Sequence, residues 1–291
     1  MRILISGASG FLGRYVLKEL ALTDHEVILL VRSRESILEI SQTYPEFRCY
    51  ELDYLYGLEK FRLHLDFDVF LNLAWGNLDD FQSSDHLNLE LPAQKNLLSW
   101  AISMGVKSIV SVGTCLEYSN LNGELSEDSP CESKIPYAMA KNQLKKFLRE
   151  QSTLSGFDLT WVRLFYFYGP GQQQRTIFGQ LANAVDQKHK VFNALTHGFQ
   201  TLDYMHVDDV AKSLVRILLT RQAHGDVNIC SGQPRTLREI TNQWIRDLDW
   251  DIQISWGSHE SREYESHSFW GSSRKLAAIN AIWDLDITND K

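Results

Sequence analysis

The chain opens with "MRILISGASGFLGRYVLKEL" (residues 1–20), where an apolar run leads through three glycines into an amphipathic stretch. The pattern predicts a buried strand, a tight turn and a helix. Gly7 would permit the turn, Gly10 would let the backbone approach a ligand, and Gly13 would let the helix pack closely on the strand. The N–H groups at the helix start would then face an anion, which we expect to be a pyrophosphate. A strand–helix turn without a ligand is the alternative for this spacing, G-x-x-G-x-x-G.

Short apolar runs and helical stretches alternate through the first half of the chain. This alternation is typical of a parallel sheet with helices on both faces, and each run is too short to be a buried helix. The predicted fold class is therefore α/β, with a doubly wound parallel sheet. The expected strands are 3–6, 27–31, 48–52, 69–73, 108–112 and 159–165, and the expected helices are 11–22, 88–104 and 137–154.

The pattern changes after Phe165, where "YFYGPGQQQ" (166–174) has the composition of a loop. The tail from about Trp256 is aromatic and polar, and we expect it to be irregular as far as "RKLAAINAIW" (274–283). The second half is expected to pack as a smaller lobe against the first. Its expected elements are helices at 176–187, from about 207 and at 236–248, and a strand and turn within 225–234.

Composition limits the possible partners and the location of the chain. With 291 residues, 44% hydrophobic and 23% charged, it resembles an ordinary soluble protein. A net charge of −8 repels phosphate backbones, so we expect no nucleic-acid partner. We expect no signal peptide and no membrane span, because the chain starts with a strand and no apolar run approaches about 18 residues. The cysteines at 49, 115, 131 and 230 form no C-x-x-C pair, which favours free thiols and a cytoplasmic location.

His206 lies close in sequence to Asp203, Asp208 and Asp209, a group that could suggest a metal site. The spacing fits no defined set of metal ligands. We interpret the histidine as a strand end and the acids as the first turn of a helix, where carboxylates are stabilising. No metal is expected.

The end of the second predicted strand carries "LLVRSRES" (29–36), with Arg32, Ser33 and Arg34 and no acid before Glu35. An acid there would accept hydrogen bonds from a ribose 2′-hydroxyl, whereas a guanidinium attracts a 2′-phosphate. The sequence therefore favours NADP(H) over NAD(H); two solvated surface arginines are the alternative. Asp53, after the third strand, would either contact adenine or cap a turn.

Tyr137 and Lys141 in "PYAMAKNQLKKFL" (136–148) lie four residues apart, on one face of a predicted helix. An ammonium group beside a tyrosine stabilises the phenolate, so such a tyrosine can exchange a proton with a carbonyl or hydroxyl group near neutral pH. The fifth strand ends in "SIVSVGTCLEYS" (108–119), which offers Thr114 as a hydroxyl partner for the same oxygen.

These motifs, together with "NLAW" (72–75), "RLFYFYGPGQ" (163–172) and "LDYMHVDDVA" (202–211), resemble the extended short-chain dehydrogenase/reductases. More narrowly, the chain resembles the nucleotide-sugar epimerase/dehydratase/reductase family, in the expected order over nearly its whole length. The resemblance implies a Rossmann domain for NAD(P), formed by 1–165 with 203–230 returning to it. It also implies a smaller mixed α/β lobe for a nucleoside-diphosphate sugar, formed by 166–202 and 231–291.

The resemblance also implies roles for individual residues. Tyr137 would be the acid/base, Lys141 would lower its pKa and hold the nicotinamide ribose, and Thr114 would bind the reacting sugar oxygen. Cofactor contacts are expected from Gly7, Ser9, Gly10, Phe11, Leu12, Gly13, Arg32, Ser33, Arg34, Asp53, Leu73, Ala74, Trp75, Asn88, Val112, Tyr137, Lys141, Leu164 and Phe165. Substrate contacts are expected from Trp75, Thr114, Cys115, Glu117, Tyr166, Tyr168, Arg175, Arg235 and Arg262.

Departures from the family pattern narrow the expected activity. The 4,6-dehydratases of the family follow the threonine with an Asp-Glu pair, but here Thr114 is followed by Cys115 and Leu116. Arg32 favours NADPH, which suits net reduction. The sequence therefore predicts reduction of the C4 keto group of a nucleotide-linked 4-keto-6-deoxyhexose, in the supply of sugars for surface polysaccharides. A nucleotide-sugar 4-epimerase is the rival enzyme, and a regulator that binds NADP(H) without turnover is the rival from another class.

The substrate side departs from the family at Leu202, where the family has an arginine that contacts the sugar-nucleotide diphosphate. Arg175 is our first candidate to replace it, ahead of Arg235 and Arg262. Trp75 would line the substrate or nicotinamide pocket, or else belong to the core. The resemblance also suggests a homodimer formed through the helices at 88–104 and 137–154.

Overall fold

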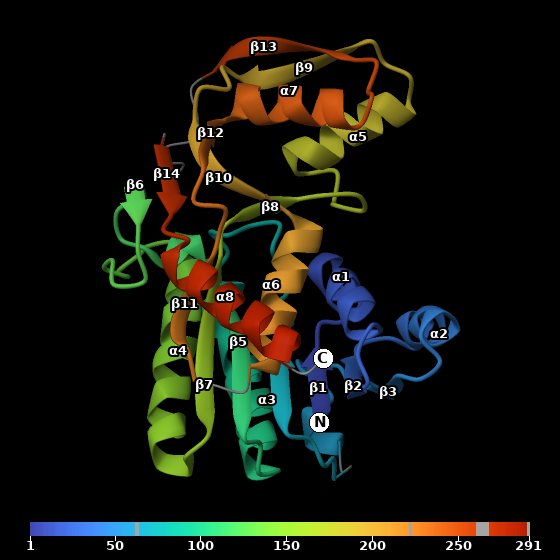
Figure 1. Cartoon of the computed structure of the whole chain (residues 1–291), viewed down its shortest axis with the longest axis vertical. Coiled ribbons are helices and arrows are strands. Elements are labelled where there is room, and N and C mark those ends of the chain that lie inside the picture. Colours follow the sequence, from blue (N-terminus) through green and yellow to red (C-terminus); the bar gives the residue numbers. More distant parts are fainter. Residues whose placement is uncertain (62–63, 221–222, 260–267, 290–291) are drawn as a thin grey trace.

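The computed structural model describes residues 1–61, 64–220, 223–259 and 268–289. Within these ranges, seven strands form a parallel sheet in the order β11-β7-β5-β4-β1-β2-β3 (Figure 1). The strand order reverses between β1 and β4, the point at which doubly wound sheets bind ligands. This sheet confirms the predicted Rossmann-type α/β fold. The strands span Arg2–Ser6 (β1), Glu26–Val31 (β2), Arg48–Glu51 (β3), Val69–Asn72 (β4), Ser108–Thr114 (β5), Asp158–Leu164 (β7) and Gly225–Ile229 (β11).

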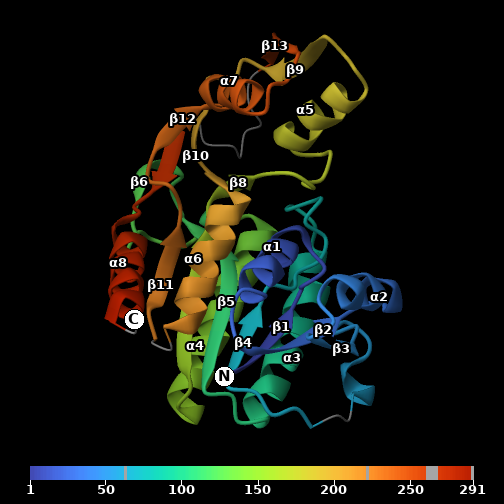
Figure 2. The same ribbon diagram turned by 45° about the vertical axis from the view of Figure 1, so that its right-hand side comes forward.

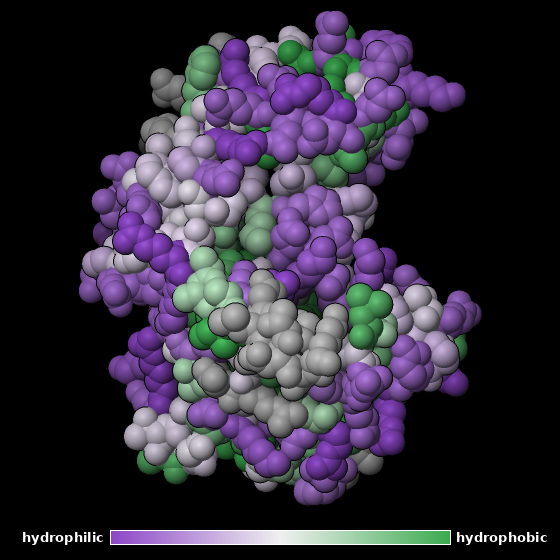
Figure 3. Space-filling model, viewed as in Figure 1, coloured by the Kyte–Doolittle hydropathy of each residue, from purple (hydrophilic) through white to green (hydrophobic). Residues whose placement is uncertain are grey.

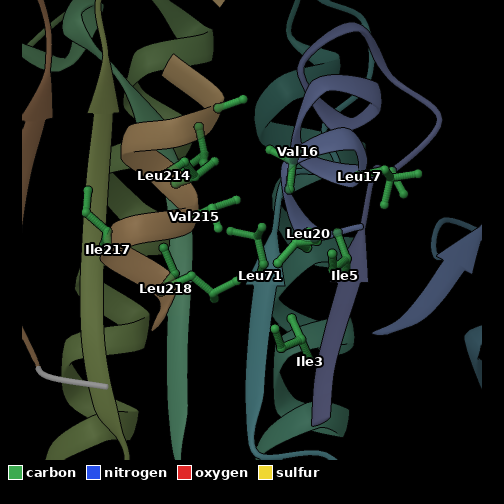
Figure 4. Close-up of a cluster of buried hydrophobic side chains, with 14 of the residues drawn as sticks. Ile3, Ile5, Val16, Leu17, Leu20, Leu71, Leu214, Val215, Ile217 and Leu218 are labelled. Atoms are coloured by element: carbon green, nitrogen blue, oxygen red, sulfur yellow. The ribbon is translucent and has the colours of Figure 1, made fainter. Parts of the chain in front are cut away.

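Helices cover both faces of the sheet, because strands such as β1 and β4 bury side chains on both sides. On one face α1 packs against α6, and Figure 4 shows the apolar side chains that fill the space between these helices and the sheet. On the other face α3 and α4 enclose a second core around the fully buried Trp161. The helices of this domain are α1 (Phe11–Leu20), α2 (Arg34–Thr43), α3 (Leu91–Ser103), α4 (Pro136–Ser155) and α6 (Val207–Leu219).

The small lobe lies beyond the carboxyl ends of the sheet strands (Figures 1 and 2). Its described residues form a sheet in the order β12-β10-β14-β6, with β8 beside β10, and a separate β9–β13 pair. Helices α5 and α7 share an aromatic core with this lobe around Phe178 and Trp244. The elements are β6 (Asn122–Leu125), β8 (Tyr166–Tyr168), α5 (Ile177–Asp186), β9 (Val191–Thr196), β10 (Thr201–His206), β12 (Pro234–Thr236), α7 (Leu237–Asp247), β13 (Gln253–His259) and β14 (Ser268–Gly271).

The chain crosses between the two domains at places that differ in part from the predicted ones. Helix α6 and strand β11 return to the large domain, but β10, which contains 203–206, belongs to the small lobe. The last helix, α8 (Arg274–Asn289), packs on α6 and β11 rather than in the lobe, because Leu276 and Ile279 are buried in the core of the large domain. The predicted lobe segment 231–291 therefore divides between the domains, and β6 from the first segment joins the lobe sheet beside β14.

Local structure differs from the sequence prediction at three further places. The predicted helix at 88–104 begins with a π-helical turn, η2 (His86–Glu90), before α3 starts. Helix α2 was not predicted; Ser33 caps it by accepting a hydrogen bond from Ser36 N. The tail expected to be irregular contains β13 and β14, whose partners β9 and β6 lie far away in the sequence.

The surface in the view of Figure 3 is mostly hydrophilic, and it is hollowed between the small lobe and the large domain. Among the described residues, no helix has both the length and the apolar character needed to cross a membrane. The four cysteines are free thiols, with Cys115 and Cys230 buried. No cluster of three or more His, Cys, Asp or Glu side chains suited to a metal ion occurs in the described part of the chain.

Candidate active site

The glycine turn, residues 7–10, joins β1 to α1. It lies beside Ala74, which follows β4. Gly7 has φ +79°, and a Cβ there would lie 2.6 Å from Ala74 N, so the turn requires glycine. A Cβ on Gly13 would collide with the carbonyl oxygen of Gly7. Gly10 is exposed and forms the N-cap of α1, and it has no side chain to accept hydrogen bonds from the first turn. The free N–H groups at this helix start fit the pyrophosphate of a dinucleotide.

The structure brings together the three residues predicted to carry the chemistry. Thr114 is the last residue of β5, while Tyr137 and Lys141 lie on successive turns of α4. Thr114 lies within hydrogen-bonding reach of the Tyr137 hydroxyl. Lys141 Nζ donates to the carbonyl oxygen of Val112 at 2.7 Å and lies 5.8 Å from the centre of the Tyr137 ring. Two hydroxyls and an ammonium group therefore converge at one edge of the sheet, where they could stabilise an oxyanion and supply its proton.

The electrostatics of this group differ from the prediction. Burial raises the pKa of Tyr137 above its usual value; the negative charge of Glu117 also raises it, and the hydrogen bond with Thr114 lowers it. Burial lowers the pKa of Lys141 to about 7, while Glu117 and Glu90 act in the opposite direction. In the protein alone, desolvation therefore has a larger effect on Tyr137 than its lysine neighbour does, contrary to the expected lowering of its pKa.

Aromatic side chains that follow β4 surround Tyr137. Phe81 stacks on Tyr137 with ring centres 5.0 Å apart, and the His86 ring lies 5.1 Å away. Trp75 Nε1 donates to His86 Nδ1 at 3.1 Å, and the Trp75 ring lies 3.9 Å from Lys141 Nζ. The sequence suggested a role for Trp75 but not for Phe81 or His86, since neither belongs to a recognisable motif.

Most of the expected cofactor-side residues lie around the carboxyl ends of β1, β4, β5 and β7. Asn88 is exposed on η2, whereas Glu90 and Gln94 are buried. Gln94 Nε2 donates to Ala74 O at 2.7 Å, and Glu90 accepts from the Tyr54 hydroxyl at 2.7 Å. Ser9 belongs to the glycine turn, and Phe11 and Leu12 begin α1. Leu73, Leu164 and Phe165 lie at or just beyond strand ends, and Val112 lies in the second half of β5.

The residues expected at the far end of the cofactor lie at the start of α2. Arg32 and Arg34 are exposed, and Ser33 is the N-cap between them. Asp53 Oδ1 accepts a hydrogen bond from Leu55 N at 3.0 Å, so this carboxylate caps a turn, the second of its two predicted roles.

Glu117 does not lie where the expected substrate contact requires it. We call residues 114–117, at the end of β5 and just beyond it, the catalytic loop. The Glu117 side chain is 0% exposed and points beneath this loop, where it accepts hydrogen bonds from Thr114 N, Trp161 and Arg163. A carboxylate held by several donors on the core side cannot also reach a ligand in the cleft. Cys115 is buried as well, and it lies beside Thr114.

The expected lobe residues do not form one cluster. Tyr166 and Tyr168 lie on β8, which pairs with β10 in the small lobe. Tyr168 packs into the core of the lobe against Trp244, with ring centres 4.7 Å apart. Arg175 pairs with Asp79 across the two domains. Arg235 stands opposite Leu202 in the antiparallel β10–β12 pair, and Arg262 lies outside the described residues.

A model of the NAD dependent epimerase/dehydratase family matches residues 3–230 of the chain. The chain belongs to this family. Membership confirms the resemblance drawn from the sequence motifs, and it supports a nicotinamide dinucleotide as the cofactor class. The glycine turn and the Thr114–Tyr137–Lys141 group both lie within the matched residues.

Relatives of the chain include proteins named as nucleotide-sugar enzymes. A dTDP-6-deoxy-L-talose 4-dehydrogenase (NAD(+)) of Aggregatibacter actinomycetemcomitans is 28% identical over 280 residues, which cover 94% of this chain and 100% of the relative. A GDP-6-deoxy-D-mannose reductase of Pseudomonas aeruginosa is 23% identical over 99% of this chain and 93% of its own length. A UDP-glucuronic acid 4-epimerase from Bacillus cereus, solved with UDP-glucuronic acid and NAD, matches with a TM-score of 0.80 at 20% identity, covering 96% of this chain and 92% of that one, and so supports the fold.

Proposed function

We propose that the protein reduces the C4 keto group of a nucleoside-diphosphate 4-keto-6-deoxyhexose with NADPH, in the supply of deoxyhexoses for surface polysaccharides. The observation that carries the proposal is the convergence of Thr114, Tyr137 and Lys141 beside the glycine turn. The two relatives above, a 4-dehydrogenase and a reductase of 6-deoxy sugars, support the same type of reaction.

The catalytic loop favours reduction over dehydration. Removal of water from a sugar needs carboxyl groups as acid and base. The two positions after Thr114 hold Cys115 and Leu116, which are both buried, and the carboxylate of Glu117 points into the core. The loop therefore offers hydroxyl groups to a substrate oxygen and no carboxylate.

The nicotinamide supplies the hydride when it is bound. Thr114 and Tyr137 would donate hydrogen bonds to the C4 oxygen as negative charge develops on it, and Tyr137 would then give up its hydroxyl proton. Lys141 would stabilise the resulting phenolate, and Val112 O orients this ammonium group by accepting its hydrogen bond. The aromatic side chains of Trp75, Phe81 and His86 would exclude water from the reacting oxygen.

The preference for NADP(H) is supported by the exposed guanidinium groups of Arg32 and Arg34 and by the Ser33 hydroxyl at the start of α2. Guanidinium groups bind phosphates through charge-assisted hydrogen bonds. The relative from Aggregatibacter actinomycetemcomitans is named for NAD(+), so the two cofactors must be compared directly.

For the diphosphate we now favour Arg235 over Arg175. Directly opposed residues of an antiparallel pair share one face of a sheet, so Arg235 can replace from β12 the arginine that the family has at position 202 on β10. Both arginines have partners within the protein, Asp79 for Arg175 and Gln243 for Arg235, so the choice rests on the register of β10 and β12. The expected homodimer through the helices near 88–104 and 137–154 stays a prediction, which sedimentation equilibrium would test.

The test is to incubate the purified protein with NADPH and a panel of nucleotide-linked 4-keto-6-deoxy sugars, and to follow the loss of NADPH absorbance. We expect one NADPH to be consumed for each sugar reduced. Conversion of a nucleotide sugar without net NADPH consumption would favour the 4-epimerase instead. Tight NADPH binding with no conversion of any sugar would favour the regulator.

A further inference from the structure

A buried carboxylate lies directly beneath the catalytic loop. Glu117 Oε1 accepts hydrogen bonds from Thr114 N at 2.9 Å and Trp161 Nε1 at 3.1 Å. Its Oε2 accepts from Arg163 Nε at 3.0 Å and from Lys145 Nζ at 3.3 Å. Donors from β5, β7 and α4 therefore meet on one carboxylate that is fully removed from solvent.

The backbone of β5 is shaped to admit this carboxylate. A Cβ on Gly113 would collide with both Glu117 Oε1 and the Trp161 indole nitrogen, so glycine leaves the space in which they meet. Thr114 and Glu117 also form a capping box, in which the Thr114 hydroxyl accepts from Leu116 N while Glu117 accepts from Thr114 N. The position of the Thr114 backbone is thus fixed from below by Glu117.

The charge of Glu117 is part of a longer buried network. Arg163 Nη2 pairs with Asp226 at 2.6 Å, Lys145 lies 3.6 Å from Asp226, and Arg149 pairs with Asp226 from the surface side at 2.6 Å. Glu117 and Asp226 therefore share Arg163 and Lys145, but only Glu117 touches the catalytic loop. Breaking a buried pair of this kind by removing one partner is costly, because the other charge stays buried.

Glu117 also acts electrostatically on Tyr137 and Lys141. Glu117 raises the pKa of both Lys141 and Tyr137, against a background in which burial is the larger influence on each. The other titratable groups that face Lys141 or Tyr137 are Glu90 and His86 on η2 and Cys115 on the catalytic loop. Those that face Glu117 from its other sides are Lys145, Arg163, Asp226 and Cys131.

We propose that Glu117 is a positioning residue, whose buried carboxylate holds the Thr114 backbone in place and sets a negative charge at the end of β5, the strand to which Lys141 also donates a hydrogen bond. This inference rests on the proposed roles of Thr114, Tyr137 and Lys141. It does not depend on which sugar is the substrate, or on whether the enzyme reduces or epimerises it.

The test compares Glu117→Gln with Asp226→Asn, which removes an equal charge from the same network without touching the loop. Nuclear magnetic resonance of Lys141, assigned with Lys141→Met, gives its titration midpoint without any substrate. In Glu117→Gln the midpoint should move to lower pH, by about one unit, because a stabilising negative charge is lost. In Asp226→Asn it should stay where it is in the wild type. Equal shifts in both variants, or no shift in Glu117→Gln, would overturn the proposal.

The double variant Glu117→Gln/Lys145→Met keeps the net charge of the network, and Arg163 stays paired with Asp226. It serves as the test if Glu117→Gln alone does not fold. A smaller downward shift is expected from it, because loss of the Lys145 charge raises the Lys141 midpoint while loss of the Glu117 charge lowers it. Where turnover can be followed, the alkaline limb of the kcat profile should move with the midpoint. A chain that shows the Lys141 shift but converts no sugar would leave the positioning role standing and refute the proposed function.

Discussion

At the scale of single residues, the proposed chemistry depends on three side chains that meet at one edge of the sheet. Thr114, Tyr137 and Lys141 belong to spaced motifs on elements that a parallel sheet brings to one edge, so their convergence follows from the topology. Phe81 lies in the segment before η2 and His86 begins η2, and no local pattern encodes the path that brings them to Tyr137. Glu117 was misplaced because a sequence shows that a carboxylate follows the threonine, but not which way its side chain points.

Arg32 allows the first test at this scale. Replacing Arg32 by alanine removes a guanidinium group from the expected 2′-phosphate site. NADPH should then bind about tenfold more weakly, since a charge-assisted hydrogen bond is worth roughly 1.5–3 kcal/mol, while NADH affinity should change little. Fluorescence titration of each cofactor measures both. Arg48→Ala, which removes an exposed arginine paired with Glu26, is the matched control. Equal weakening of both cofactors by Arg32→Ala would contradict the preference for NADP(H).

At the scale of elements, the strand–helix units of the large domain were predictable because each carries its own apolar periodicity. The strands β6, β8, β12, β13 and β14 were not, because they are short and pair with partners that lie far along the chain. Their stability comes from tertiary packing rather than from local sequence preference. Turn glycines, by contrast, could be assigned from sequence, since their role depends on the backbone alone.

A glycine of the turn and a glycine of α1 should behave differently when replaced by alanine. In Gly13→Ala the new Cβ meets the Gly7 carbonyl, so we expect a loss of about 1–3 kcal/mol of unfolding free energy. In Gly10→Ala the nearest atom is Gly7 O at 3.2 Å and the glycine is exposed, so the fold should persist while cofactor affinity falls. Thermal melts and cofactor titrations of both variants separate the two roles. A Gly10→Ala variant that binds cofactor as the wild type does would place the cofactor elsewhere.

Asp68 links the ends of β1, β4 and β5, and it predicts a pH effect. Its carboxylate accepts from Lys107 Nζ at 2.8 Å and Arg2 N at 2.9 Å, and these bonds hold its pKa at about 2. A lowered pKa stabilises the fold above the unfolded value of about 3.9, and that stability is lost as the pH falls toward 2. Asp68→Asn should therefore cost stability at pH 7, by ~1 kcal/mol or less given its exposure to solvent, and almost none near pH 2.

Denaturant unfolding at several pH values measures the effect of Asp68→Asn. The exposed neighbour Asp66, which pairs with the Arg2 side chain, provides Asp66→Asn as the control. A deficit in Asp68→Asn that does not change with pH would show that the carboxylate stabilises by shape and not by charge.

At the scale of the whole molecule, the chain leaves the large domain and returns to it, and its last helix completes the core of the large domain. Helix α8 packs on α6 and β11 (Figure 2). Leu276 and Ile279 of this helix are buried in the core, whereas Ile282 is 45% exposed. The division of the chain into domains could be anticipated only in outline. A helical pattern shows which residues face a core, but it does not show whether that core belongs to the large domain or to the small lobe.

Leu276→Ala tests the placement of α8. It should lower the unfolding free energy of the large domain by about 2–5 kcal/mol, because a buried side chain leaves a cavity. Ile282→Ala should change it little. Hydrogen exchange of β11 and α6 amides localises the loss, and an effect confined to the small lobe would contradict the observed packing.

The central claim is that the Tyr137 hydroxyl delivers a proton at a carbonyl held beside a nicotinamide, and Tyr137→Phe tests it most directly. Phenylalanine keeps the stacking on Phe81 and removes only the hydroxyl. Tyr118→Phe is the control, since the Tyr118 hydroxyl bonds to Asn228 and Arg163 rather than to Tyr137 or Thr114. In single-turnover reduction, Tyr137→Phe should bind NADPH as the wild type does but lose at least about a hundredfold in rate, while Tyr118→Phe keeps most of it. An unchanged rate in Tyr137→Phe would contradict the account.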